Sequence, residues 1–515
     1  MANRWRSSWC IARVLLVLSV LWVVVGAVPA AAQGASDLSA GAVRSADRQP
    51  ALASRVAQRP DAAKADHPVT FTKDIAPILQ RSCQQCHRPD SIAPMSLLTY
   101  QQVRPYARAI KQRTQLAYVP GLRGVMPPWL IERNIGVQKF KEDLRLSDEE
   151  IATIAGWADS GAPEGNPADL PPPLTFAAAD RWFLGKPDLI VSSPPVLVKG
   201  VGPDWWGDFG ETPSDIPEDR YAATVEYKET SDLTKSAALL KSTSTAATYA
   251  GQGKTSIFVV HHGNASVRRP SETGNLTNLS QHEVGHNGDI FAADGGKLVP
   301  AKAIFVWNAH IHSPGVPGAD RNAVLNVGLK FHPKGYKPKY SEGNIRISNS
   351  ELDIRPDSAS QRYDAYYVAQ QPMRLLNFEP HMHATGMRMC IEAIYSRSVE
   401  TISCAGYDHN WVRNYQYDDN TAPLIPKGTI VHTISWFDGT AKNSNIIEPR
   451  NTTVWGRRSV QNMLGVNNEV FFLTDEQYQE ELAKRREYLN RTNGWDTVVG
   501  CPGCFEQPAA GRGRP

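Results

Sequence analysis

The run Cys83-Gln84-Gln85-Cys86-His87 decides how the first third of this chain folds. It has the form C-x-x-C-H, which is the attachment signature of a c-type haem. Two thiols at this spacing can add to the two vinyl groups of one haem, and the adjacent histidine then reaches the iron. The alternative is a disulfide or redox C-x-x-C followed by a chance histidine. We expect one covalent haem held by Cys83, Cys86 and His87.

A haem of this type often has a methionine thioether opposite its histidine. Met126 lies in the stretch Val125-Met126-Pro127-Pro128-Trp129, where two prolines would hold a loop rigid against the haem. Met95 is the competing choice, but it is close to His87 in sequence and is expected to pack in the core. We therefore predict Met126 as the second axial ligand.

The N-terminal segment is typical of an exported protein. Two arginines precede an apolar run from Leu15 to Val28, and Ala30-Ala31-Ala32 offers a cleavage site before Gln33. An uncleaved membrane anchor is the alternative, because the apolar run comes close to the length that spans a bilayer. We expect a signal peptide at 1–32 and a periplasmic or secreted protein, with the membrane involved only if this segment is uncleaved.

Length and composition indicate several domains and a β-rich chain. The 515 residues suit two to four domains, and the mixed charges, with a net charge of +3, do not imply nucleic acid. Thirteen tryptophans, with 37 prolines beside 38 glycines, suit a loop-rich β protein. Residues 33–67 are rich in Ala, Ser, Asp and Arg without an apolar period, and we expect a flexible linker there.

The spacing of apolar residues along the sequence indicates one helical domain followed by two β domains. Ser147 is a good N-cap with Glu150 at the capping-box position, and Gly161 would end that helix. We predict a small all-α cytochrome c domain at 68–168. Two all-β, jelly-roll-like sandwich domains follow at 169–345 and 346–475, and a C-terminal helix and tail at 476–515. The clearest strands are expected at 257–260, 303–307, 389–395 and 429–436.

Four cysteines remain in the β region and the tail. Cys390 and Cys404 flank an expected hairpin with its turn near 396–398, and they could pair across it in an oxidising compartment. Cys501 and Cys504 could close a small disulfide loop, because a second metal site there would need partners that the sequence does not offer nearby.

The β region also holds eleven of the thirteen histidines, and six of them occur as three close pairs. The H-x-H pairs His310/His312 and His381/His383 would each point two rings to one face of a strand, because side chains alternate. The vicinal pair His261-His262 could serve one metal only at a strand end or a bulge. Imidazole suits copper, zinc and iron. The unpaired histidines are expected to be ordinary packed or surface residues: His282, His286, His332, His409 and His432.

These motifs together resemble a known family. The β region is similar to the type II copper, ascorbate-dependent monooxygenases, the group of peptidylglycine α-hydroxylating monooxygenase and dopamine β-monooxygenase. The whole chain resembles bacterial members with a fused N-terminal cytochrome c. The resemblance runs from about Phe71 to Met463 and rests on these stretches: CQQCHRPDSIAPMSLLTY, MPPW, LSDEEIATIAGWADSGAPEG, VVHHG, PHMHATG, YDHNW, LIPKGTIVHTISWFD and VWGRRSVQNM.

The resemblance implies two copper ions in two β-sandwiches, with a solvent cleft between them. The electron-transfer copper would take His261, His262 and a third histidine, His310 or the competing His312. Two histidines stand there where the family has one.

The oxygen-binding copper would take His381, His383 and Met463. The implied reaction is C–H hydroxylation of a small organic substrate, not identified by the sequence, by O2. Electrons would come from a periplasmic donor through the fused haem. Residues 205–254 match nothing in the family.

Two other functions compete with a monooxygenase. A non-enzymatic electron carrier, or a periplasmic copper-binding protein, would share every ligand and lack only a substrate. A copper oxidase or nitrite reductase of the cupredoxin type would need a Cys thiolate. Neither Cys390 nor Cys404 has a histidine at the appropriate following position, which argues against that class.

Overall fold

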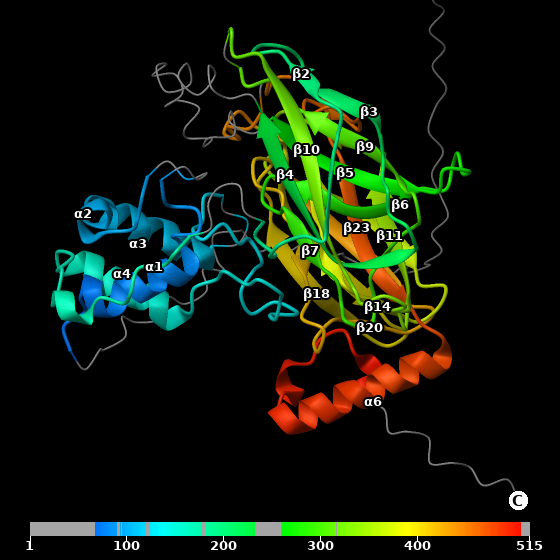
Figure 1. The fold of residues 1–515 in the computed structure, drawn as a ribbon. Helices are drawn as coiled ribbons and strands as arrows, with labels where there is room; N and C mark the ends of the chain where they lie inside the picture. The colour runs from blue at the N-terminus through cyan, green and yellow to red at the C-terminus, as the bar shows by residue number, and fades with distance from the viewer. Residues whose placement is uncertain are drawn as a thin grey trace, which may run out of the picture. The chain divides into compact units, whose positions relative to one another are not determined.

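The structure, a computed structural model, describes residues 67–89, 93, 95–119, 121, 123–176, 182–231, 259–315, 317–446 and 448–505. The predicted signal peptide and nearly all of the predicted linker lie outside these residues. Most of the described elements are β-strands and few are helices, which confirms a mainly β fold (Figure 1). Within the described part of the chain, no helix has both the length and the apolar character needed to cross a membrane.

The first described region is helical and has a hydrophobic core of its own, which includes the fully buried Ile75, Leu79, Ile154 and Trp157. Its elements are a π-helical turn (Phe71–Ile75), α1 (Ala76–Ser82), α2 (Tyr100–Val103), α3 (Ala107–Gln115) and α4 (Asp148–Asp159). The predicted capping box of α4 is confirmed. The Ser147 hydroxyl accepts from the Glu150 backbone N–H, and the Glu150 side chain accepts from the Ser147 N–H.

Two antiparallel sheets built from residues 189–331 form a first β-sandwich. One sheet has the order β1-β10-β4-β7, with β2 on β10 and β8 on β4, and the other has the order β3-β9-β5-β6. Val225 on β4, Ala265 on β5 and Phe305 on β9 share one core, so the two sheets pack face to face. The strands are β1 (Leu189–Ser192), β2 (Val196–Val198), β3 (Trp205–Pro213), β4 (Arg220–Ser231), β5 (Val260–Arg268), β6 (Thr277–Glu283), β7 (Gly288–Ile290), β8 (Lys297–Val299), β9 (Ile304–Ile311) and β10 (Arg321–Phe331).

A second sandwich follows. Its sheets have the orders β11-β23-β14-β20, with β16 on β23, and β13-β21-β17-β18. Their strands are β11 (Ser341–Asn349), β13 (Gln361–Val368), β14 (Met373–Leu375), β16 (Pro380–Met382), β17 (Gly386–Ile394), β18 (Val399–Gly406), β20 (Leu424–Ile425), β21 (Ile430–Phe437) and β23 (Leu464–Phe472). Two short pairs accompany them: β12 (Asp353–Ile354) with β22 (Thr453–Val454), and β15 (Asn377–Phe378) with β19 (Tyr415–Gln416).

The strands test the sequence-based boundaries. The strands predicted at 303–307, 389–395 and 429–436 correspond to β9, β17 and β21. The predicted domain boundary at 345/346 is wrong, because it cuts β11, which pairs along its whole length with β23. The second sandwich therefore begins by Ser341.

A segment expected in the helical domain instead belongs to the second sandwich. Trp129, Ile131 and Phe140 lie in the core of that sandwich. Strand β18 is the edge strand of its sheet, and the segment hydrogen-bonds to the exposed edge of that strand. The Glu132 N–H donates to Cys404 O at 2.9 Å, and the Val137 N–H donates to Ile402 O at 2.8 Å. The predicted domain at 68–168 is thus not one packing unit.

Both predicted cysteine pairs are at disulfide distance. Cys390 and Cys404 are directly opposed across the β17–β18 hairpin, whose turn occupies 395–398 as expected. Cys501 and Cys504 also pair, and they lie in a hydrophobic core shared with the C-terminal helix α6 (Asp475–Thr492).

Buried polar contacts join the two sandwiches. The Lys297 ammonium on β8 lies 2.5 Å from a Glu342 carboxylate oxygen and 2.9 Å from one of Glu469, on strands β11 and β23. The Gln416 amide donates to Asp289 at 2.8 Å. Lys297, Asp289 and Glu469 are all buried, so these contacts fix how the two halves of the site below face each other.

Candidate metal centres

The predicted haem-binding run forms a turn directly after α1. The His87 backbone N–H donates to Cys83 O at 2.9 Å, and His87 Nδ1 lies 3.2 Å from Met95 O. The Cys83 and Cys86 thiols are free rather than joined in a disulfide. Burial lowers the pKa of His87, so its ring is neutral at pH 7 with Nε2 left for another partner. Two thiols and a neutral imidazole on one turn are the donor set that a covalent haem requires.

The two candidate methionines differ in their surroundings. Met95 is partly buried and packs against the core of the helical region, as predicted. Met126 is 38% exposed and lines a small cavity with Thr114, Val125 and Ile151. His87 does not line that cavity, so the pairing of Met126 with His87 across a haem stays a prediction.

All six paired histidines of the β region come together in one cluster, and His409 joins them. Neighbouring ring centroids are 4.4 Å apart for His261 and His312, 5.0 Å for His262 and His310, and 5.4 Å for His262 and His381. We call these seven rings the histidine cluster: His261, His262, His310, His312, His381, His383 and His409.

Strand pairing explains how the first sandwich presents four of these rings. On β5 and β9, His262 is directly opposite His310, and the register shifts between Val260 and His262. His261 is the extra residue at that shift, so its ring is not held to the alternation of a regular strand. Of the two placements at which a vicinal pair could serve one metal, a strand end or a bulge, the structure has a bulge, close to the start of β5. His312 follows β9 by one residue.

The second sandwich presents His381 and His383 at the end of β16. This strand pairs with β23, where His381 is opposite Gly465 and Met382 is opposite Leu464. Continued by one residue, the same antiparallel register places Met463 beside His383. His383 Nδ1 lies 3.1 Å from Gln461 O, in the same segment. The structure thus brings His381 and His383 to one strand end, and the place of Met463 beside them follows from the register alone.

His409 is the ligand candidate that sequence reasoning missed. It lies on the loop after β18, 7% exposed, and its ring centroid is 4.6 Å from that of His261 and 5.9 Å from that of His383. An isolated histidine gives no pairing signal. The stretch YDHNW is one of those on which the resemblance rests, but nothing in the sequence shows that the loop folds back onto β5.

The geometry separates the two candidates for the third ligand. His310 Nδ1 lies 3.3 Å from His262 Nε2, and His310 Nε2 lies 2.8 Å from an Asp204 carboxylate oxygen. His312 instead stacks on His261 at an interplanar angle of 10°. Its Nε2 lies 3.0 Å from the hydroxyl of Ser459, a residue of the second sandwich. His310 thus contacts His262 and Asp204, and His312 contacts His261 and Ser459. The His310 and His312 rings are also 4.7 Å apart, and one ligand atom each of His310, His312 and Asp204 lie within 4.8 Å of one another.

Burial keeps the cluster neutral at pH 7. Burial, the larger cause, and neighbouring imidazoles together lower the pKa of His312 and of His383 to about 4 and that of His381 to about 3. The pKa values of His261, His262 and His409 are also held well below 6.5 by burial. A neutral imidazole is the form that binds a metal ion.

Several ring nitrogens of the cluster have no hydrogen-bond partner although they are buried. These atoms are His381 Nδ1, His383 Nε2 and His409 Nδ1. A buried polar atom without a partner is costly, and a metal ion would satisfy such lone pairs. The residues present therefore fit the copper ions that the resemblance implies.

Two buried carboxylates lie behind His381. His381 Nδ1 is 3.9 Å from Glu283 Oε1, and one ligand atom each of Glu283, Glu379 and His381 lie within 4.8 Å of one another. Burial raises the pKa of Glu283 to about 8 and holds that of Glu379 well above its usual range. A carboxyl group beside a histidine is the arrangement that orients a metal-binding imidazole.

The histidines lie closer together and are less exposed to solvent than the resemblance implies. Six of its seven histidines are buried, and the rings form one continuous group, where two separated sites with a solvent cleft were expected. The reason lies in the contacts between the sandwiches. Ser459 reaches His312, and its backbone N–H donates to Asp204 at 3.0 Å, so the loop before β23 covers the end of the first sandwich.

The unmatched stretch that begins at Trp205 also takes part. Strand β3 pairs with β9 and brings Trp206 against His262, with ring centroids 4.4 Å apart. Of the histidines expected to be ordinary, His286 is paired with Asp289, His432 with Asp364, and His332 stacks on Tyr336. These three are packed residues, as predicted.

No family model matches the chain. No curated protein matches it either. Among solved structures, the exported protein XepA of PBSX is similar at 6% identity, with a TM-score of 0.13, over 48% of this chain and 86% of that one. A similarity at that level says nothing about function.

Proposed function

We propose that this protein is an exported oxidoreductase that carries one covalent haem c and two copper ions and hydroxylates a C–H bond of a small organic substrate with O2. The observation that carries the proposal is the histidine cluster, in which seven neutral imidazoles gather, with Met463 directly before the strand β23 that pairs with the His381 strand. A thioether beside two imidazoles favours Cu(I), the state that binds O2.

The helical region would be the electron-entry domain, a cytochrome c domain. Cys83 and Cys86 would hold the haem, His87 would be its proximal ligand, and Met126 would be the ligand opposite. Bound haem supplies one-electron transfer. The Met95 carbonyl beside His87 Nδ1 would hold the orientation and tautomer of the ring, so that Nε2 would be the nitrogen that binds iron.

The two β-sandwiches, expected to be jelly-roll-like, would hold the copper ions. His381, His383 and Met463 would hold the copper that reacts with O2, and the histidines of the first sandwich would hold the copper that relays electrons. Bound copper supplies O2 chemistry and one-electron redox. Gln461 O would orient His383 through Nδ1, and Glu283 would lie behind His381. The electron donor would be periplasmic.

A second function, electron carrier or copper-binding protein, is favoured by one observation. His310 and His383 are at most 1% exposed, and His262 is 2% exposed, which leaves a substrate little access in this arrangement. A carrier needs only electron exchange, for which buried ligands are sufficient.

One set of measurements on the purified protein tests both functions. Acid–acetone extraction should leave the haem on the chain, and metal analysis should find about two copper ions, whose electron paramagnetic resonance signals should be of the type II kind. The reduced protein should then consume O2 faster when a substrate is added. Haem and copper without any O2 uptake would favour the carrier, and a protein without copper would contradict both.

A further inference from the structure

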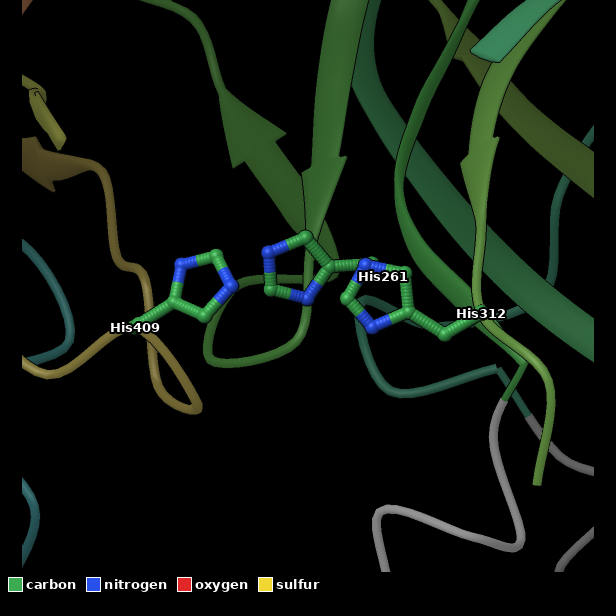
Figure 2. Close-up of side chains that lie close together, drawn as sticks. All are labelled: His261, His312 and His409. Carbon is green, nitrogen blue, oxygen red and sulfur yellow. The ribbon is translucent and has the colours of Figure 1, made fainter. Parts of the chain in front are cut away.

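Three imidazoles of the histidine cluster are placed so that one ion can reach all of them. One ring nitrogen from each of His261, His312 and His409 lies within 4.8 Å of the others. Figure 2 shows the three rings next to one another, with His261 between His409 and His312, whose own centroids are 6.2 Å apart. The centroid distances agree, at 4.4 Å from His261 to His312 and 4.6 Å from His261 to His409.

The other two first-sandwich histidines are already engaged. Both nitrogens of His310 have partners, in His262 Nε2 and the Asp204 carboxylate, and these contacts also occupy His262 Nε2. His312 has a partner at Nε2 alone, the Ser459 hydroxyl at 3.0 Å. By contrast, His409 Nδ1 is buried without a hydrogen-bond partner. The lone pair that needs a partner is thus on His409, although the resemblance assigns that residue no role.

We propose that His261, His312 and His409 hold one copper ion, so that this site is shared between the two sandwiches. Three neutral imidazoles suit copper, with zinc as the common competitor. Metal–nitrogen bonds of about 2.0–2.1 Å would set the three nitrogens roughly 3.3 Å apart, so the nitrogens must move inward by about 1 Å. His312 must also turn out of its stack on His261, because the lone pair of an imidazole nitrogen lies in the plane of the ring. The inference rests on the proposed function, because it assumes that the protein binds copper. It assigns a different set of ligands to the copper that relays electrons.

The loop that carries His409 is hydrogen-bonded to two other regions of the chain through residues that follow His409. The Trp411 indole N–H donates to Pro128 O at 3.0 Å, and the Arg413 guanidinium donates to Gly285 O at 2.8 Å. Gly285 belongs to the first sandwich and Pro128 follows the Met126 loop. His409 therefore sits on a pinned segment, which a metal ligand needs if it is to hold its geometry.

The test uses the full haem-loaded chain, stripped of copper and titrated with Cu(II). A His383→Ala background removes the O2-reactive site, so the remaining copper reports on the shared site alone. In that background, His409→Ala should weaken copper binding by at least about 10–100-fold, since outer partners alone cost that much. His332→Ala, which removes a histidine stacked on Tyr336 outside the cluster, should leave binding unchanged.

The nitrogen couplings in the electron paramagnetic resonance spectrum provide the second readout. They should fall from about three imidazoles in the background protein to about two after His409→Ala. Unchanged affinity and couplings in His409→Ala would overturn the inference, and loss of copper in His262→Ala alone would restore the family set of ligands. If His409→Ala does not fold, His409→Gln makes the same test with a side chain of similar size.

The outcomes separate this inference from the proposed function. If copper binds and His409→Ala loses it but the protein shows no O2 chemistry, the shared site stands and the monooxygenase proposal fails. If the protein hydroxylates a substrate and His409→Ala keeps both coppers, the reverse holds. A chain that binds no copper would overturn both.

Discussion

The haem-binding turn and the histidine cluster are two ways of building a metal site. In the first, Cys83, Cys86 and His87 lie within five residues, on a turn that follows one helix. In the second, the ligand candidates come from two sandwiches and are up to 202 residues apart in sequence, from His261 to Met463. A local site depends on a single turn, whereas the cluster depends on how two domains dock. The difference should be visible in what each mutation disturbs.

The largest expected effect is a variant that loses its haem but keeps the copper of the histidine cluster. Cys83→Ala together with Cys86→Ala should abolish covalent attachment, because no thioether bond can then form. Copper content should stay the same, because neither thiol contacts the histidine cluster. Haem staining after denaturing electrophoresis, combined with metal analysis, makes the measurement. Copper lost in parallel with haem would break the comparison, since the two sites would then depend on each other.

Met463→Leu should separate redox chemistry from packing. Leucine keeps an apolar side chain of similar size and removes the thioether, which favours Cu(I). The reoxidation of the reduced protein by O2 should slow by about 10–100-fold or more, while copper content falls much less, because His381 and His383 remain. Stopped-flow absorbance follows the reaction. Wild-type rates in this variant would show that Met463 only packs.

Acid should destabilise the metal-free cluster. Burial lowers the pKa of His312 and His383 to about 4 and that of His381 to about 3, against about 6.5 in an unfolded chain. Between pH 6.5 and 4 the unfolded state therefore binds more protons, so stability falls as the pH falls, by about 1.4 kcal/mol per pH unit for each such histidine. Urea unfolding across this pH range measures the free energy of unfolding. That free energy should depend less steeply on pH in His312→Ala than in His332→Ala.

The smallest effect concerns the haem's second ligand. Met126→Ala should remove the visible absorption band of an axial thioether on ferric haem and lower the reduction potential, while Met95→Ala should leave the band in place. Both haem attachment and copper content should be unchanged. Loss of the band in Met95→Ala alone would reverse the assignment and would place the ligand in the partly buried core of the helical region.

Elements with a strong local signal were predictable. The capping box at Ser147 and Glu150 and the hairpin between Cys390 and Cys404 both depend on residues that are near neighbours. The six paired histidines could be selected for the same reason, because two rings on adjacent or alternate positions already suggest a shared partner.

What could not be predicted depends on docking. Nothing near His409 shows that its loop reaches β5, and nothing near Trp129 or Phe140 shows that they fill the second sandwich instead of the helical core. The same holds for β11, whose partner β23 lies more than a hundred residues later. Apolar periodicity shows that a residue is buried, but it does not show in which core.

The bridging position of His409 also bears on the order in which the protein matures. A site with ligands from both sandwiches does not exist in either one alone, so full-affinity copper loading follows the folding and docking of both. The haem turn needs only its own segment, so haem attachment does not depend on that docking. Haem attachment would then come first, docking of the two sandwiches second and copper binding last. Copper would stabilise the docked arrangement of a chain that is already folded.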